Sequence, residues 1–217
     1  MARNMKTDQG EKPTRRRRTQ DERSASTIEN LCRTTVELIA EIGFVNVTTT
    51  KIAERAGISR GAILHHFDSK ADLVKRATGL MWSSVVSSAA AISEDHRNAG
   101  LDPKTLIDRA WTGLMSDLFV TVSIDMMAAA RGDPDLNEHV HFWINQMFAS
   151  YRDTAHEVFG RSGMSDAEAE ALMTVMTSTL RGLRIAQMIE PDPKKAQAAL
   201  DALADLLKAR MGSGDRP

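Results

Sequence analysis

Apolar residues recur at three- and four-residue steps along most of the chain, which is the spacing of amphipathic helices. The first such stripe begins after residue 21 and ends at Gly43, a residue type that commonly follows the last turn of a helix. The stripe consists of Ile28, Leu31, Cys32, Val36, Ile39 and Ile42. Because an apolar helical face is stable only when it packs against other elements, we expect a small helical core in this region.

Two short helices are predicted directly after this stripe. Thr48 is a suitable N-cap for a helix at residues 49–56, and Gly57 can adopt the left-handed backbone that ends it. Ser59 then caps a third helix, so a short turn containing glycine joins the two, as in a helix-turn-helix whose second helix enters the DNA major groove. Ala53 supplies the small side chain that the crossing needs. The apolar contacts beneath are expected from Ile52, Ile58, Ile63 and Phe67.

The remaining chain predicts further helices. Asp68 is expected to cap a long fourth helix that runs toward a polar break at residues 93–100. Asp102 and Pro103 are a cap and a first helical residue, and the helical pattern that they open continues to a break at residues 131–134. The last three predicted helices lie at about 138–159, at about 165–189 after a capping box of Ser165 and Glu168, and at about 193–210 after Asp192.

Composition supports an all-α fold, because the chain is rich in alanine, methionine, leucine and charged residues and contains only six prolines. Its 217 residues accommodate one small module and one larger body that can bury a core of its own. The one cysteine, Cys32, excludes an internal disulfide and is expected to be a small core residue. We find neither a secretory signal nor an apolar run long enough for a membrane span, so we expect a cytoplasmic protein.

The net charge of −1 hides an uneven distribution. Residues 1–76 contain 15 Lys/Arg and 10 Asp/Glu, and most of this excess lies in residues 1–19, which hold 7 basic and 2 acidic side chains. These first residues contain few apolar groups and are expected to be disordered. Such an arm can bind nucleic acid or can be a solvated tail, and its charge alone does not decide between the two.

The stretch from Thr48 to Leu73 resembles the TetR family of bacterial transcriptional regulators. The resemblance rests on elements at fixed spacing: Ile52-Ala53, Ala56-Gly57-Ile58-Ser59, Gly61, His66-Phe67 and Ser69-Lys70. At the sequence level it covers about residues 24–80. One departure is Leu64, where the family commonly has a tyrosine whose hydroxyl can reach a DNA phosphate. That contact is therefore either lost or replaced by His65 or His66.

The resemblance implies an N-terminal three-helix helix-turn-helix domain and a larger C-terminal helical domain for dimerisation and ligand binding. The predicted segments are a disordered basic arm at 1–19, the DNA-binding domain at 20–76, the effector-binding and dimerisation domain at 77–211 and a disordered tail at 212–217. The implied partners are a palindromic double-stranded DNA operator, a second copy of the chain and a small apolar or amphipathic effector. Residues 138–159 and 165–189 are the candidate dimer helices, where Gly182 and Ala186 would allow close approach.

Candidate DNA contacts lie around the two short helices. The first turn of the third helix exposes N–H groups that favour a phosphate, while Arg60 can instead reach guanine and Gly61 lets a backbone approach closely. The resemblance favours His65 over His66 as a contact, and it favours a phosphate partner for Lys70, which can otherwise be solvated beside an acidic neighbour. The candidates are Thr48, Thr49, Ser59, Arg60, Gly61, His65, His66 and Lys70.

The larger domain contains soft apolar side chains that can line an effector cavity or simply form core. They are Trp111, Met115, Phe119, Met126, Phe142, Trp143, Met147, Met173 and Met176. Arg181 and Arg184 can meet an anionic ligand or form ion pairs at the surface or in a dimer.

The resemblance predicts a repressor released from its operator by an effector; the alternatives are a ligand-blind regulator and an architectural DNA-binding protein. We find no nucleophile elbow and no glycine-rich phosphate loop, so no enzyme and no cofactor are predicted. His139 and His141 lie about 200° apart on a helix, and His65 and His66 about 100° apart, so neither pair predicts a metal site.

Overall fold

The computed structural model describes residues 20–212, and these residues form helices joined by short turns, with no strand among them. The predicted all-α fold is therefore confirmed. The basic arm at 1–19 and, apart from Gly212, the predicted C-terminal tail lie outside the described residues. The elements are α1 (Gln20–Ile42), η1 (Phe44–Asn46), α2 (Thr49–Ala56), α3 (Arg60–His66), α4 (Lys70–Ala99), α5 (Pro103–Gly113), α6 (Asp117–Ala130), α7 (Pro134–Phe159), η2 (Gly160–Ser162), α8 (Asp166–Ile189) and α9 (Pro193–Met211).

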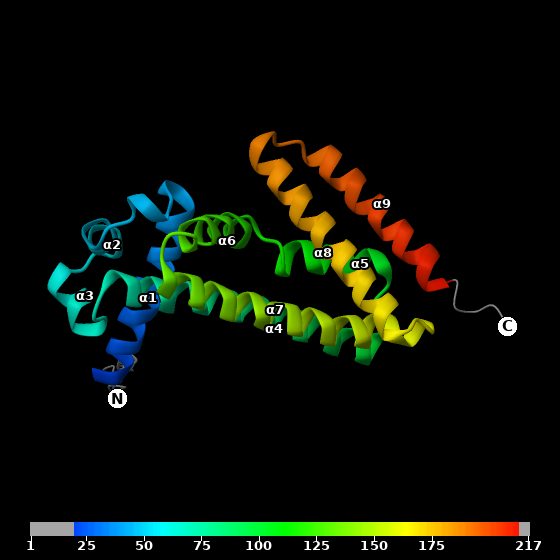
Figure 1. Cartoon of the computed structure of the whole chain (residues 1–217), viewed down its shortest axis with the longest axis horizontal. Coiled ribbons are helices and arrows are strands. Elements are labelled where there is room, and N and C mark those ends of the chain that lie inside the picture. Colours follow the sequence, from blue (N-terminus) through cyan, green and yellow to red (C-terminus); the bar gives the residue numbers. More distant parts are fainter. Residues whose placement is uncertain (1–19, 213–217) are drawn as a thin grey trace, which may run out of the picture.

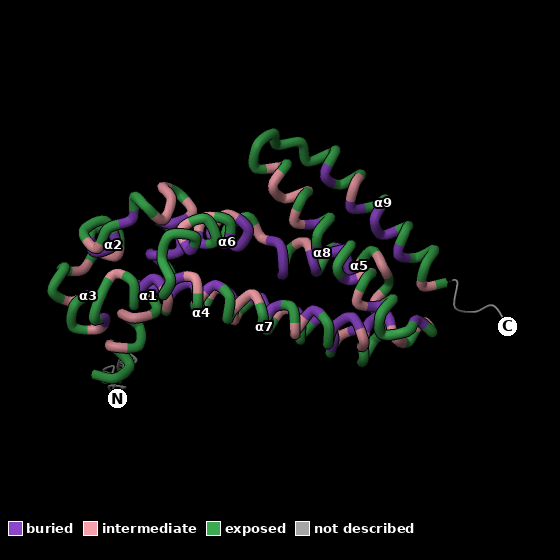
Figure 2. The backbone as a smooth tube through the Cα atoms, viewed as in Figure 1, coloured by how far each residue is buried: buried purple, intermediate pink, exposed green. Residues whose placement is uncertain are grey.

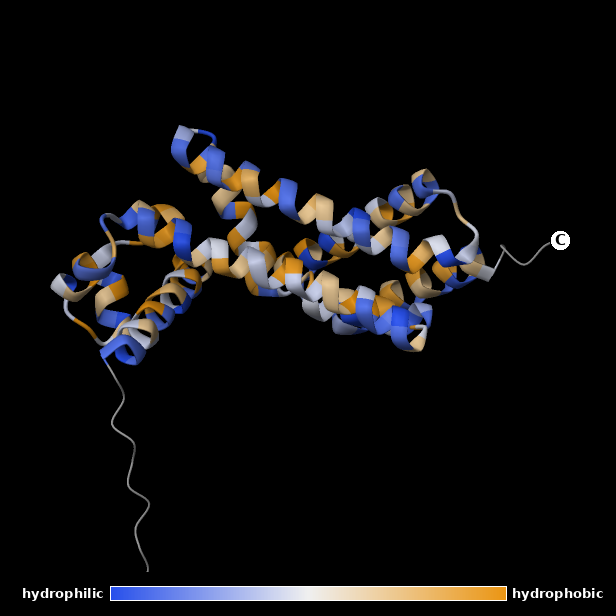
Figure 3. Cartoon of the chain, turned by 90° about the horizontal axis from the view of Figure 1, so that it is seen from below, coloured by the Kyte–Doolittle hydropathy of each residue, from blue (hydrophilic) through white to orange (hydrophobic). Residues whose placement is uncertain are grey.

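Helices α1 to α3 form a small unit at one end of an elongated molecule, and α9 ends at the other (Figures 1 and 3). The Thr48 hydroxyl caps α2 by accepting from the Lys51 N–H at 3.3 Å, and Gly57 ends α2 with φ 70°. The predicted α1 stripe faces inward, since four of its six members are buried and the outermost two, Ile28 and Ile42, are half-buried. Ala53 and the apolar residues at the crossing close this core as predicted: Ile52, Ile63 and Phe67 are buried and Ile58 packs against them.

The long helix α4 differs from the prediction at both ends. Its N-cap is Ser69 rather than Asp68, because the Ser69 hydroxyl accepts the Asp72 N–H at 3.0 Å. The helix also continues through the predicted polar break at residues 93–100 and ends at Ala99, because the Ser93 hydroxyl is buried and hydrogen-bonded, to the Ala89 carbonyl and to Thr154 Oγ1. The predicted domain boundary at residues 76 and 77 falls inside this continuous helix.

Helices α4 and α7 lie side by side and run in the same direction (Figure 1). Their cross-helix contacts keep a nearly constant register: Thr78 with His139 at 2.9 Å, Ser93 with Thr154 at 3.0 Å and Arg97 with Glu157 at 3.3 Å. The buried positions of both helices alternate with exposed ones along their length (Figure 2). Helices α6 and α8 pack against this pair.

The stretch after Pro103 is two helices rather than one. Residues 114–116 interrupt it, and Ser116 caps α6 by accepting the Phe119 N–H at 3.3 Å. Helix α7 begins at Pro134, earlier than predicted, because Asp133 caps it through the Leu136 N–H at 3.0 Å. The capping box of Ser165 that opens α8 is present as predicted.

Arg184 fastens α8 to the α5–α6 turn. Its guanidinium lies 3.5 Å from the centre of the Trp111 ring, donates to the Met115 carbonyl at 2.6 Å and pairs with Asp117 at 3.0 Å. No single helix in residues 20–212 is long and apolar enough to cross a membrane. Helices α5 and α6 reach the required length and apolar composition only when they are counted together, and the chain bends by 56° between them.

Candidate DNA-binding surface and effector cavity

The predicted DNA contacts gather around α2 and α3 and the turns that precede these helices. Ser59 caps α3 by accepting the Ala62 N–H at 3.2 Å, which leaves the first turn of α3 open to solvent. Arg60 is exposed and forms no ion pair or hydrogen bond with another described residue. Of the eight candidates, Thr48, Ser59, Arg60, Gly61 and His65 are exposed, whereas Thr49, His66 and Lys70 are half-buried.

Leu64 stands on this surface with 62% of its area exposed. A leucine so exposed contributes little to the core, and it has no group that can donate a hydrogen bond to a phosphate. The rings of His65 and His66 lie next to it in the sequence, with centroids 5.3 Å apart. Either histidine can therefore donate a hydrogen bond in place of the missing hydroxyl, and His65 is the more exposed of the two.

Lys70 turns back toward η1 instead of extending outward. Its ammonium nitrogen lies 4.7 Å from the centre of the Phe44 ring and donates to the Phe44 carbonyl at 3.4 Å. Partial burial lowers the pKa of this lysine. Its role as a phosphate contact remains a prediction, and in the free protein it helps to hold η1 on α4.

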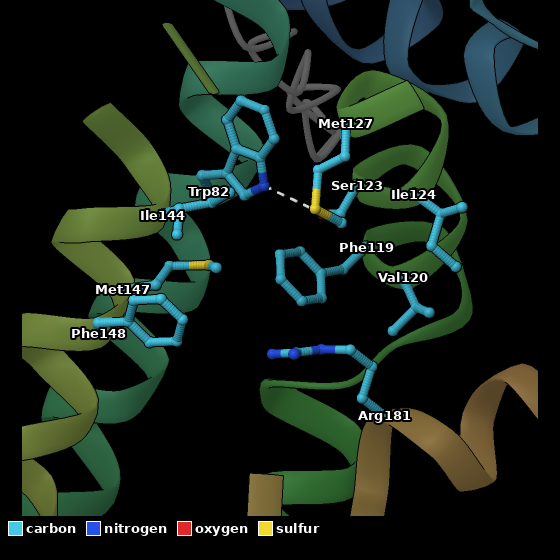
Figure 4. A pocket seen from close by; sticks show the side chains of 10 residues that line it. All are labelled: Trp82, Phe119, Val120, Ser123, Ile124, Met127, Ile144, Met147, Phe148 and Arg181. Atoms are coloured by element: carbon cyan, nitrogen blue, oxygen red, sulfur yellow. Dashed lines mark hydrogen bonds between the residues drawn. The ribbon is translucent and has the colours of Figure 1, made fainter. Parts of the chain in front are cut away.

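A small cavity of about 90 Å³ lies between α4, α6, α7 and α8 (Figure 4). Sites that hold small organic ligands usually measure about 300 to 1,000 Å³, so a ligand that binds here would have to move the cavity walls apart. The indole N–H of Trp82 crosses the cavity wall and donates to the Ser123 hydroxyl oxygen at 3.0 Å. The walls consist of Trp82, Phe119, Val120, Ser123, Ile124, Met127, Ile144, Met147, Phe148 and Arg181.

Helix α6 connects this cavity to the DNA-binding end of the molecule. Ile124 and Met127 line the cavity, whereas Asp125, which lies between them in the sequence, does not. The Asp125 carboxylate accepts a hydrogen bond from the backbone N–H of Phe44, the first residue of η1. Gly43, just before it, has φ 78° and ψ 146°, a conformation that only glycine adopts readily. A shift of α6 would therefore move the start of η1, the segment that leads into α2.

Comparison with known proteins gives the family. Residues 31–77 match the model described as "Bacterial regulatory proteins, tetR family". This chain is a TetR-family transcriptional regulator. The matched segment runs from Leu31 in α1 to Ala77 in α4 and so includes all of α2 and α3.

Relatives of this TetR-family chain agree along most of its length. It is 24% identical over 200 residues to the HTH-type transcriptional regulator CymR of Pseudomonas putida, covering 90% of this chain and 96% of the relative. A TetR-family structure from Mesorhizobium loti shares its fold with a TM-score of 0.70 at 17% identity, covering 86% and 97% of the two chains. A regulator structure from Pseudomonas aeruginosa gives 0.64 at 20% identity, covering 89% and 93%. These proteins are named as transcriptional regulators, not as enzymes.

Two of the nine predicted cavity residues of this TetR-family chain, Phe119 and Met147, line the cavity. The other seven lie elsewhere. Met115, Met126 and Met176 are fully buried core, and Met173 lines a separate groove between α7 and α8. Trp111 packs under the Arg184 guanidinium, Trp143 packs against Gly79, and Phe142 is 54% exposed on α7.

Sequence reasoning missed Trp82 because its indole meets Ser123 only when α4 packs against α6. A usable signal was present in the spacing of the cavity-lining side chains on two helices. Phe119, Ser123 and Met127 follow one another at four-residue steps on α6, and Ile144 and Phe148 do so on α7. Two such rows facing each other predict a long apolar wall. In residues 20–212 no group of three His, Cys, Asp or Glu side chains is arranged to hold a metal ion.

Proposed function

We propose that this TetR-family regulator is a dimeric repressor that leaves a palindromic operator when a small apolar or amphipathic molecule enters the cavity. The observation that carries the proposal is the double role of α6. The same helix supplies half of the cavity wall and holds the start of η1 through the contact of Asp125 with Phe44. An occupant of the cavity that displaces α6 would therefore alter the position of the DNA-binding helices.

The DNA contacts of the proposal are the eight residues around α2 and α3, with Arg60 as the candidate base reader. Its exposed side chain has no partner among the described residues, so no internal bond must break before it reaches a base edge. Residues 20–76 act as the DNA-binding domain and residues 77–211 as the domain for effector binding and dimerisation. In a dimer, the two α3 helices would enter successive major grooves about 34 to 36 Å apart.

Exposed small and apolar side chains support a dimer built on α8 and α9. Val175 is 57% exposed, Ile189 81% and Leu206 69%, which is costly for a monomer in water. The exposed row on α8 continues through small residues, so that a second helix can approach closely. This row comprises Ala171, Val175, Ser178, Gly182, Ala186 and Ile189 on α8. Helix α9 is exposed at Ala198, Ala202 and Leu206. The pattern thus favours α9, rather than α7, as the partner of α8 in the interface.

A matched pair of proteins tests the effector part of this proposal. Ile124→Trp would fill the cavity from α6, and Phe142→Trp would add the same side chain on the exposed surface of α7 as a control. A compound library is screened by thermal unfolding, because a ligand at 100 times its dissociation constant stabilises the folded state by about 2.7 kcal/mol. Such a ligand would raise the unfolding temperature of a protein of this size by about 5 to 11 °C.

We expect compounds that stabilise the wild type and the Phe142→Trp protein but not the Ile124→Trp protein, and that release the wild type from its operator DNA. Compounds that stabilise all three proteins equally would place the ligand outside the cavity. If no compound releases the operator, a ligand-blind regulator becomes the better account.

A further inference from the structure

Arg181 is the charged residue in the wall of the effector cavity, and its guanidinium points into the hollow between Phe119 and Phe148 (Figure 4). The remaining wall is apolar apart from Ser123, whose hydroxyl oxygen is already engaged by Trp82. Arg181 is half-buried and forms no hydrogen bond or ion pair with any other residue between 20 and 212. A partly desolvated cation without a partner is costly, so this guanidinium is a ready site for an anion.

A second unsatisfied donor lies in the groove that adjoins the cavity. Tyr151 is 4% exposed, and its hydroxyl oxygen has no hydrogen-bond partner within the described part of the chain. Tyr151, Arg181 and Phe148 line a groove of about 420 Å³ between α7 and α8, and Phe148 and Arg181 also line the cavity. Burial raises the pKa of Tyr151 to about 12, so the hydroxyl keeps its proton at neutral pH and can donate it to an acceptor.

Within residues 20–212, neither Arg181 nor Tyr151 has a carboxylate as an ion-pair or hydrogen-bond partner. Glu170 is the one acidic residue among the described residues that line the groove, and its Oε1 lies 3.0 Å from His156 Nε2. Glu170 also precedes Arg181 by eleven residues on α8, which is about 16 Å along the helix axis. Arg184, one turn beyond Arg181, shows the contrasting case, because its guanidinium is fully engaged by Asp117 and backbone carbonyls.

We propose that the effector is an amphipathic organic anion whose carboxylate is bound by Arg181 and Tyr151 and whose apolar body fills the cavity between α4, α6 and α7. A planar carboxylate accepts two parallel hydrogen bonds from a guanidinium and retains lone pairs for a neighbouring hydroxyl. The aromatic and thioether side chains of the wall suit an apolar body of varied shape. This inference rests on the proposed function, since it names the chemistry of the molecule that the cavity takes.

Three probes with one apolar body test it: 4-phenylbutanoate, 4-phenylbutanamide and 4-phenylbutylamine. Their affinities for the purified full-length protein are measured by titration calorimetry. We expect the wild type to bind the carboxylate about 10- to 100-fold more tightly than the amide, the range that charge-assisted hydrogen bonds produce, and to bind the amine most weakly. Arg181→Met should lose this preference while its affinity for the amide changes by less than about threefold.

Two further variants separate local chemistry from general charge. Arg152→Met removes an exposed cation from the groove between α7 and α8 and should leave the preference for the carboxylate unchanged. Tyr151→Phe should weaken carboxylate binding by about 3- to 10-fold. Without ligand, the same variant should unfold at the wild-type temperature or above it, because the hydroxyl that it removes has no partner.

Equal affinities of the wild type for carboxylate and amide would overturn the inference, as would the absence of binding by all three probes. The comparison of carboxylate and amide affinities in the wild-type protein tests the inference even if Arg181→Met does not fold. An Arg181→Met protein that becomes monomeric while the wild type is dimeric would show that the guanidinium pairs across the dimer, which also overturns it. None of these results touches the proposed function, which fails separately if no operator sequence is bound.

Discussion

Asp125 lies where the cavity-lining helix α6 contacts η1, so its substitution tests the proposed link between the cavity and the DNA-binding helices. Its carboxylate accepts the Phe44 N–H, and a hydrogen bond to a charged group contributes about 1.5 to 3 kcal/mol. Phe44 is half-buried, so water can partly replace the lost acceptor in Asp125→Ala, and we expect a loss of about 1 to 2 kcal/mol. For a chain of this length, that loss lowers the unfolding temperature by about 2 to 8 °C.

The assay is native-state hydrogen exchange of the Phe44 amide together with thermal unfolding. If opening of this contact governs exchange, the loss in Asp125→Ala corresponds to about 5- to 30-fold faster exchange. The same factor is the most by which the effector-induced release from the operator should weaken, because a contact cannot transmit more free energy than it contributes.

Asp135→Ala is the matched control, since this aspartate is 86% exposed and lies 3.8 Å from Lys75. An exposed pair of this kind contributes at most about 1 kcal/mol, so Phe44 exchange should remain unchanged. Exchange of Phe44 in Asp125→Ala at the wild-type rate, or an equal response of the two variants, would refute the argument that α6 holds η1 through Asp125.

Three further predictions concern single side chains. Arg60→Ala should weaken binding to the specific operator by about 1 to 3 kcal/mol in an equilibrium binding assay; an equal loss on all DNA sequences would make Arg60 a phosphate contact instead. Burial lowers the pKa of His96, whose Nδ1 lies 3.1 Å from the Leu101 nitrogen, so the unfolded chain binds this proton more readily than the folded protein. The free energy of unfolding should therefore fall as the pH drops below 6.5, and a His96→Gln protein with an equally steep slope in denaturant titrations would contradict this. Arg184→Met should cost about 2 to 4 kcal/mol of unfolding free energy, because it removes the ion pair with Asp117 and leaves two backbone carbonyls without their donor; a loss below about 1 kcal/mol in a urea titration would count against that role.

Features that depend on neighbouring residues were predictable from the sequence. The cap at Thr48, the stop at Gly57 and the capping box of Ser165 each require only residues within four positions, and all three are present. The helix-turn-helix follows from these local signals together with the small side chain at Ala53. The same local signals misplaced the cap of α4 by one residue, since Asp68 and Ser69 are both good capping residues.

Features that depend on distant residues were not predictable in the same way. Ser93 reads as polar, but Thr154, 61 positions later, accepts its hydrogen bond and keeps α4 helical through the expected break. The cavity wall shows the same limit, because Trp82 and Ser123 come together only when α4 and α6 pack. Composition placed soft apolar residues in the C-terminal domain without telling which of them face the hollow, and Phe142 was therefore assigned to a cavity although it lies on the surface.

The most direct test of the central claim is a selection of bound sequences from random duplex DNA with the purified full-length protein at fixed salt. The account predicts one enriched palindromic motif, whose half-sites are centred about one helical turn apart, or a multiple of it, and which two copies of the chain occupy. Enrichment of a single non-repeated site, or no enrichment above non-specific binding, would contradict the reading of this TetR-family chain as a dimeric operator-binding repressor.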